Sequence, residues 1–149
     1  MISHQEPRLI KGGLAADDRG HLKFVNEFPL SGFKRFYVVE NHEKGFVRAW
    51  HGHKREAKAV VCLQGSAIVA AVKPDNWSNP SVDLEVSRFV LSGSSPSALF
   101  IPAGHANGFK TLTSDAMLLF FSSSTLEESV GDDFRFPARH WNPWEVDER

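Results

Sequence analysis

Residues 45–65 read GFVRAWHGHKREAKAVVCLQG, and this segment carries the strongest indications of both fold and chemistry. Alternate residues of a β-strand face the same side, so His51 and His53 are expected to be neighbours on one face, with Arg48 on the other unless a bend intervenes. Lys58 opens the next expected strand. In a small barrel the inward side chains of neighbouring strands converge, so we expect His51, His53 and Lys58 to share one pocket.

The rest of the chain has the pattern of an all-β sandwich or barrel. Short apolar runs recur between turn-forming residues, and no long window has a helical period. Residues 125–133 are expected to form one helical turn at most. The aromatic tail, residues 134–144, is expected to pack across a sheet face or a partner subunit. The expected strands cover residues 22–28, 34–39, 45–50, 58–63, 66–72, 82–91, 98–101, 108–111 and 116–122.

Composition indicates one globular domain over residues 1–149. Hydrophobic residues make up 42% of the chain, and 17 basic against 18 acidic residues give a net charge of −1. This balance offers no attraction to nucleic acid or to a membrane surface, so neither is expected as a partner. The single cysteine, Cys62, lies in an apolar run and is expected to be buried. No segment has the pattern of a signal peptide or a membrane span, so we expect a cytoplasmic location.

A second segment matches the first in character. Residues 100–109 read FIPAGHANGF, and together the two segments resemble the two conserved motifs of the cupins, which implies a double-sheet jelly roll, or double-stranded β-helix. Metal-binding cupins carry a Glu at the position of Lys58 and a His at that of Asn107. Two imidazoles beside an ammonium suit a cation poorly, so we expect no metal and no other cofactor. The alternative is a metal-dependent cupin that adds His105 to the two histidines of the first segment.

The order of the motifs resembles the cupins that act on nucleotide-linked 4-keto-6-deoxy sugars, namely dTDP-4-dehydrorhamnose 3,5-epimerases and dTDP-4-keto-6-deoxyglucose 3,4-ketoisomerases. Asp18-Arg19-Gly20 resembles the entry motif of the epimerases, and residues 48–54 are similar to the R-G-x-H-A-H-K of the ketoisomerases. Residues 58–65 resemble the strand and turn that follow in both. The resemblance covers most of residues 17–137.

This resemblance implies a role for each candidate site residue. His51 falls on the general base and Lys58 on the lysine that stabilises the enolate, while His53 would be a second proton carrier or a ligand for a sugar hydroxyl. Arg19 and Arg48 fall on the arginines that hold the diphosphate, for which a forked guanidinium is suited. The remaining candidates for contact with the substrate are Asn107, His105 and Tyr37.

One departure from the pattern bears on the reaction. Phe120 stands where the epimerases have the Tyr that acts as the acid on the opposite face, and the single tyrosine, Tyr37, lies on a different expected strand. Inversion at a carbon needs proton removal on one face and delivery on the other, so double epimerisation is disfavoured.

We therefore expect an epimerase or isomerase of a nucleotide-linked 4-keto-6-deoxy sugar in surface-polysaccharide (O-antigen-type) biosynthesis. The alternatives are a 3,4-ketoisomerase, a single-centre epimerase and a non-catalytic sugar-nucleotide-binding cupin. The resemblance also implies a homodimer in which the N-terminal strand crosses to the partner.

Overall fold

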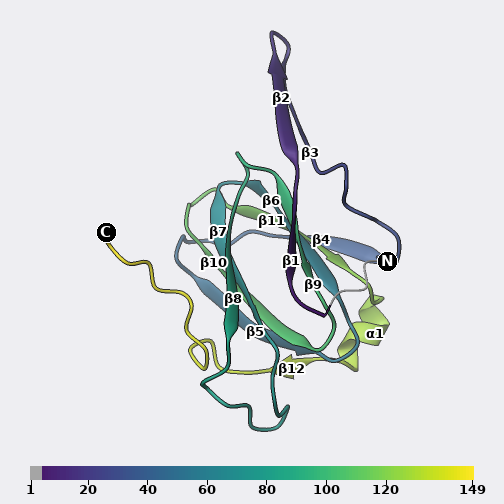
Figure 1. Cartoon of the computed structure of the whole chain (residues 1–149), viewed down its shortest axis with the longest axis vertical. Helices are drawn as coiled ribbons and strands as arrows, with labels where there is room; N and C mark the ends of the chain where they lie inside the picture. Colours follow the sequence, from purple (N-terminus) through teal and green to yellow (C-terminus); the bar gives the residue numbers. More distant parts are fainter. Residues whose placement is uncertain (1–4) are drawn as a thin grey trace.

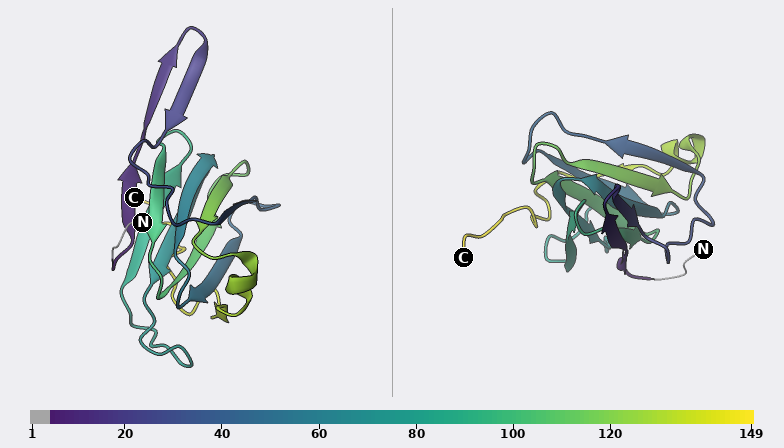
Figure 2. Two further views of the ribbon diagram at one scale, coloured as in Figure 1. Left: turned by 90° about the vertical axis from the view of Figure 1, so that its right-hand side faces the viewer. Right: turned by 90° about the horizontal axis from the view of Figure 1, so that it is seen from above.

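The chain folds into two five-stranded antiparallel sheets and a separate two-stranded hairpin (Figures 1 and 2). The computed structural model describes residues 5–149. The first sheet has the strand order β1-β9-β6-β11-β4, and the second sheet has the order β12-β5-β10-β7-β8. The predicted all-β fold, a double-sheet jelly roll of the cupin type, is confirmed. The elements are β1 (Arg8–Lys11), β2 (Gly13–Asp17), β3 (Gly20–Phe24), β4 (Arg35–Val39), β5 (Val47–His53), β6 (Lys58–Gln64), β7 (Ser66–Val72), β8 (Val86–Ser92), β9 (Ser97–Ile101), β10 (His105–Thr111), β11 (Met117–Ser122), α1 (Leu126–Val130) and β12 (Phe134–Arg135).

Most strands lie where the apolar runs predicted them, and the differences have local causes. The strand expected at residues 82–91 begins at Val86, because Asp75 holds the preceding loop by accepting hydrogen bonds from the N–H and hydroxyl of Ser81. Three strands, β1, β2 and β12, were not expected, since they are short and are not continuous apolar runs. The first of these forms by pairing with β9 along its whole length.

The main core lies between the two sheets, where inward side chains from both sheets meet. Alternation along each strand fills it from six strands, β6 to β11, as burial of one sheet face requires. Cys62 is buried in this core, as predicted, and burial raises the pKa of its thiol. The buried members are Val60, Cys62, Ala67, Val69, Ala71, Leu91, Leu99, Ile101, Phe109, Leu118 and Phe120.

The C-terminal tail covers the outer face of the second sheet, which confirms one of the two placements expected for it. The rings of Trp141 and Trp144 pack against Trp50 of β5, with centroids 5.5 and 5.1 Å away. Trp50 also donates its indole N–H to the carbonyl oxygen of Trp141 at 3.1 Å. Aromatic side chains of this size dominate the energetics of such contacts. Packing of the tail therefore stabilises β5 from the outer face of the second sheet.

An irregularity in β5 decides which of its side chains reach the space between the sheets. Its register against β10 pairs His51 with Asn107 but Arg48 with Phe109, so β5 has one more residue than β10 between these pairs. A bulge of this kind changes the side to which the following residues point. Arg48 therefore lies on the same side as His51, not on the opposite side that plain alternation predicts. Gly108 permits this close approach, because a Cβ there would lie 2.4 Å from a Cβ of β5.

The hairpin of β2 and β3 projects beyond the two sheets (Figure 1). Its turn carries Arg19, which pairs with Asp17 of the same hairpin, and the Arg19 side chain is 87% exposed.

At the other end of the chain, the short helix α1 begins with a capping box between Thr125 and Glu128. Within residues 5–149 no helix is long and apolar enough to cross a membrane.

Candidate active site

A cavity of about 290 Å³ opens between the two sheets. The second sheet contributes Arg48, His51, His53, Asn107 and Phe109 to its lining. The first sheet contributes Arg35, Tyr37, Val39, Lys58 and Phe120. Arg135 of β12, also in the second sheet, lines the cavity as well, and the remaining lining residues are Glu56, Leu126, Ser129, Val130 and Asp133. Most of the candidate residues chosen from the sequence thus surround one cavity, although they come from both sheets.

Two of the candidate residues lie elsewhere. Arg19 is at the turn of the projecting hairpin and lines a separate surface hollow. His105 follows the Pro102–Gly104 turn and faces another cavity, beside Lys73 and Glu85. Burial lowers the pKa of His105. Neither residue is brought to the main cavity within its own chain.

His51 is a half-buried imidazole on the wall formed by the second sheet. Burial is the main cause that lowers its pKa from the ordinary 6.5 to about 4, and the positive charges of Arg135 and Lys58 act in the same direction. Its ring makes no hydrogen bond to any other residue in the described part of the chain. His51 is therefore neutral near pH 7, with one ring nitrogen free to accept a proton.

His53 lies beside His51 and is held in one tautomer. Its Nδ1 lies 2.6 Å from the carbonyl oxygen of Asp132, and because a carbonyl only accepts, Nδ1 must carry the proton. Its Nε2 consequently carries a lone pair, which is buried and has no hydrogen-bond partner. Burial and the nearby charge of Lys58 lower the pKa of His53, so a second neutral imidazole faces the cavity.

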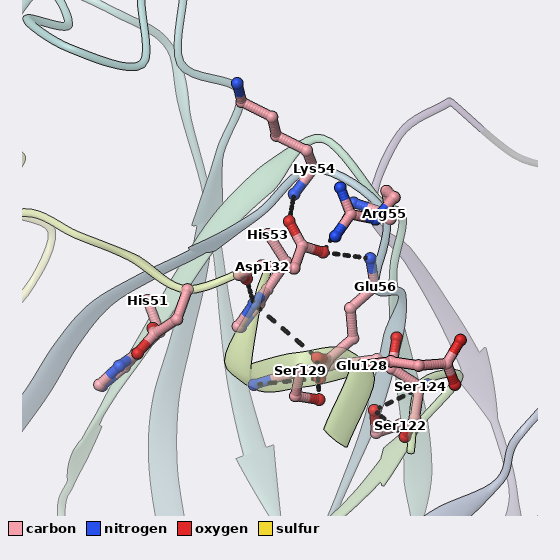
Figure 3. A network of polar contacts seen from close by, with 12 residues as sticks. His51, His53, Lys54, Arg55, Glu56, Ser122, Ser124, Glu128, Ser129 and Asp132 are labelled. Atoms are coloured by element: carbon pink, nitrogen blue, oxygen red, sulfur yellow. Dashed lines mark hydrogen bonds and ion pairs between the residues drawn. The ribbon is translucent and has the colours of Figure 1, made fainter. Parts of the chain in front are cut away.

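Asp132 organises the loop that leads from β5 to β6 (Figure 3). Its buried carboxylate accepts hydrogen bonds from the backbone N–H groups of Lys54, Arg55 and Glu56 at 2.7, 2.8 and 3.0 Å. Three successive donors on one carboxylate fix the backbone of this loop. The loop in turn directs the Glu56 side chain toward Ser129 of α1, as the figure shows.

Lys58 enters the cavity from the first sheet, opposite the two histidines. Its Nζ lies 5.7 Å from the ring centre of Tyr37 and 5.9 Å from that of Phe120. These two rings stack face to face, with centroids 5.2 Å apart and planes 6° apart. Tyr37 and Phe120 are also direct partners in the register of β4 and β11. The single tyrosine therefore stands beside Phe120 on the cavity wall that also carries Lys58.

Four charged residues of the cavity, Arg35, Glu56, Asp133 and Arg135, were missed in the sequence. Glu56 lies within residues 45–65, the segment quoted first. A carboxylate between two expected strands of that segment was the signal that could have identified it. Arg135 and Asp133 belong to the tail, and they alternate with aromatic residues that cover the outer face. That alternation, which is typical of a strand with two different faces, was the signal that could have found them.

Two further predicted residues sit at the edges of the site. Arg48 is exposed at the cavity rim, and its guanidinium has no hydrogen bond or ion pair within residues 5–149. Asn107 points into the cavity from β10, and its amide donates to the carbonyl oxygen of His51 at 3.4 Å. Across that same part of the chain, no three His, Cys, Asp or Glu side chains are grouped as a metal ion would require.

Mild acid should destabilise the fold through these histidines. The pKa values of His51, His53 and His105 are all lowered in the folded state, so the unfolded chain takes up protons first as the pH falls. Their stabilisation is complete above about pH 6.5, the ordinary pKa of histidine, and for His51 it is lost between about pH 6.5 and 4. We expect the free energy of unfolding, measured by urea denaturation, to fall from pH 7.5 to pH 5. The share of His51 is about 1 kcal/mol after allowance for its partial exposure, and this share should be missing in His51→Gln.

Comparison with known proteins gives a consistent family. The sequence profile described as dTDP-4-dehydrorhamnose 3,5-epimerase matches residues 8–134. No curated protein matches the chain in sequence. The chain is similar to a solved variant of a 3,4-ketoisomerase from Thermoanaerobacterium thermosaccharolyticum in complex with TDP-4-keto-6-deoxyglucose. The identity is 25%, the TM-score is 0.66, and 90% of each chain is covered.

Two structures of lower sequence identity also share the fold. One is dTDP-4-dehydrorhamnose 3,5-epimerase from Bacillus anthracis with TDP and PPi bound, with 20% identity and a TM-score of 0.76, covering 99% of this chain and 90% of that one. The other is a 3'-monoepimerase from Streptomyces bikiniensis in complex with dTDP-quinovose, with 20% identity and a TM-score of 0.67, covering 86% and 69%. Both epimerases and ketoisomerases are thus among the proteins of this architecture.

Proposed function

Because the chain belongs to the dTDP-4-dehydrorhamnose 3,5-epimerase family, we propose that it epimerises or isomerises a nucleotide-linked 4-keto-6-deoxy sugar, using no metal or other cofactor. One observation carries the proposal. A neutral imidazole, His51, and an ammonium group, Lys58, face the same cavity from opposite sheets. A base and a fixed positive charge on either side of a substrate are what proton removal next to a ketone requires.

In the first step, His51 takes the proton from the carbon next to the C4 ketone. The electron pair of the broken C–H bond forms a C=C bond, and the carbonyl pair moves onto oxygen to give an enolate. Lys58 stabilises this oxyanion, which develops only as the proton leaves, so the interaction lowers the barrier to the chemical step. Arg48, free at the rim of the cavity, is placed to bind the diphosphate in a forked geometry.

The returning proton decides the product. For epimerisation at a single carbon, Tyr37 is the acid that we propose. It lines the cavity beside Phe120, on the first-sheet wall opposite His51. Delivery of its hydroxyl proton to the carbon from that side inverts the configuration.

A 3,4-ketoisomerase is the second candidate, and the two imidazoles on one wall favour it. His51 would take the proton from C3 while a solvent proton is added to the C4 oxygen, which gives an enediol; the proton that His53 takes in the next step returns to solvent. The bare Nε2 of His53 would then accept the proton of the C3 hydroxyl, and His51 would return its proton to C4. The ketone moves from C4 to C3, and no acid on the opposite wall is needed.

The proposal extends to assembly and setting. We propose one domain, a homodimer in the cytoplasm and a role in making surface-polysaccharide sugars. The projecting hairpin supports the dimer, since Leu14 and Leu22 on it are exposed, and Arg19 at its turn is away from the cavity of its own chain. Light scattering after size-exclusion chromatography measures the mass in solution, and a monomer at micromolar concentration would contradict the dimer.

Incubation with a dTDP-4-keto-6-deoxy sugar in heavy water tests the reaction directly. We expect deuterium to enter the sugar at a carbon next to the ketone. NMR spectroscopy measures the incorporation and identifies the labelled carbon. Inverted configuration at one labelled carbon identifies a single-centre epimerase, and a 3-keto product identifies the ketoisomerase. Tight binding without label in any of several sugar nucleotides would contradict both and leave a binding protein.

The variant Tyr37→Phe separates the two candidates in the same assay. It keeps the stacked ring and removes only the hydroxyl. We expect the rate of epimerisation to fall about 10²-fold if Tyr37 is the acid, with deuterium exchange on the His51 side retained. A ketoisomerase should be affected less than about threefold.

A further inference from the structure

Glu56 is a buried carboxylate with an unusual set of neighbours. Its side chain is 1% exposed, and one oxygen, Oε1, accepts a hydrogen bond from the Ser129 hydroxyl at 2.6 Å. The other oxygen, Oε2, is buried without any hydrogen-bond partner. Burying a charge in this way is costly unless an opposite charge compensates it. A carboxylate with a purely structural role would be expected to have both oxygens satisfied.

Two cations approach the bare oxygen. Oε2 lies 3.8 Å from Lys58 Nζ and 3.9 Å from the guanidinium of Arg35. The Arg35 guanidinium is already engaged, because it donates to the Ser124 carbonyl at 3.1 Å and to the Ser129 hydroxyl at 2.9 Å. Lys58 Nζ makes no hydrogen bond to any residue between 5 and 149. Apart from this carboxylate, it is faced by the rings of Tyr37 and Phe120.

The other charges around Lys58 do not compensate it. His51 and His53, on the facing wall, are neutral near pH 7, and Arg35 is itself a cation. His53 Nδ1 lies 3.8 Å from Glu56 Oε1, but its proton goes to the Asp132 carbonyl. Glu56 is therefore the one carboxylate within 4 Å of Lys58 Nζ among the described residues.

We propose that Glu56 is a positioning residue that keeps the Lys58 ammonium charged and directed into the cavity. The inference rests on the proposed function for its catalytic consequence, since a neutral amine would stabilise the enolate far less. The direction of Glu56 is set from outside the cavity, by Asp132 on its backbone and by Ser129 of α1 on its carboxylate. Through these contacts, residues more than seventy positions away along the chain from Glu56 orient the carboxylate that faces the Lys58 ammonium.

Chemical reactivity of Lys58 tests the proposal without relying on turnover. Trace acetic anhydride modifies neutral amines, so the acetylation rate of Lys58 relative to the exposed Lys44 of the same molecule reports its charge. We expect Glu56→Gln, which can still accept the Ser129 hydrogen bond, to raise that ratio about tenfold at pH 7.5. Glu127→Gln removes the same charge from the exposed face of α1 and should leave the ratio unchanged. Peptide mass spectrometry measures both, and equal ratios in Glu56→Gln and wild type would overturn the proposal.

Kinetics provide the second readout. With the sugar nucleotide turned over by the wild type, Glu56→Gln should lower kcat about 10²-fold and change KM by less than about threefold, because Lys58 acts on charge that develops after binding. Glu56→Asp should recover part of kcat, whereas equal losses in kcat for Asp and Gln variants of unchanged melting temperature would count against a charge effect. If the wild type turns over no sugar nucleotide but the acetylation ratio still rises in Glu56→Gln, the proposed reaction fails and the pairing of Glu56 with Lys58 stands.

Discussion

Replacing His51 by glutamine should lower kcat for proton exchange about 10³-fold, the largest effect of any single side chain in the cavity. The physical reason is that His51 is the half-buried imidazole that burial and neighbouring cations keep neutral, and its ring nitrogens have no competing partner. Glutamine has a similar length and can make polar contacts, but it cannot take up a proton at neutral pH. Deuterium wash-in under single-turnover conditions measures the step itself.

Binding and folding should be nearly unaffected by this change. We expect the dissociation constant for the nucleotide diphosphate, measured by calorimetry, to stay within about threefold of the wild type. His42→Gln is the matched control, because His42 is exposed and lies outside the cavity, and its kcat should equal that of the wild type. A His51→Gln protein that exchanges protons within about tenfold of the wild-type rate would remove His51 from the role of base.

Replacing Asp132 by alanine should lower the free energy of unfolding by about 3 kcal/mol. The Asp132 carboxylate is 1% exposed and accepts three backbone hydrogen bonds, from Lys54, Arg55 and Glu56. Hydrogen bonds to a charged group contribute about 1.5 to 3 kcal/mol each, and donors that lose their acceptor are costly, although water can reach part of this loop. Urea denaturation followed by tryptophan fluorescence measures the loss.

The neighbouring aspartate is the matched control for this prediction. Asp133 is exposed and its carboxylate pairs with Arg135 at 2.7 Å, a contact of the kind that contributes less than about 1 kcal/mol. Asp133→Ala should therefore unfold within about 1 kcal/mol of the wild type. Equal losses for the two variants would show that the 54–56 loop does not depend on the Asp132 carboxylate.

The local sequence pattern predicted the strands that consist of a continuous run of apolar residues. The strand at residues 66–72 was predicted with its observed bounds, since it is apolar from Ala67 onward and the turn before it contains Gly65 in a left-handed conformation. The strands β1 and β12 could not be predicted in the same way. They are short, and they exist because they pair with β9 and β5, which lie far from them in the sequence.

The same distinction, between local pattern and contacts distant in the sequence, applies to the residues of the candidate site. The alternation of His51 and His53, followed by Lys58 at the start of the next strand, was enough to place these three around one cavity. The position of Arg48 depends on a bulge against β10, which no local pattern indicates. Tyr37 reaches the site only because β4 pairs with β11, some eighty residues later in the chain.

By itself, the sequence determined the all-β class, the two motifs and the chemical character of the cavity, because the two-residue period of a strand and the ionisable groups are local properties. The tertiary structure decided the charge state and direction of those groups. Burial makes His51 neutral, the Asp132 carbonyl selects the tautomer of His53, and Glu56 compensates Lys58. Each of these effects arises from desolvation or from contact between segments distant in the chain, and such contacts exist only once both sheets have formed.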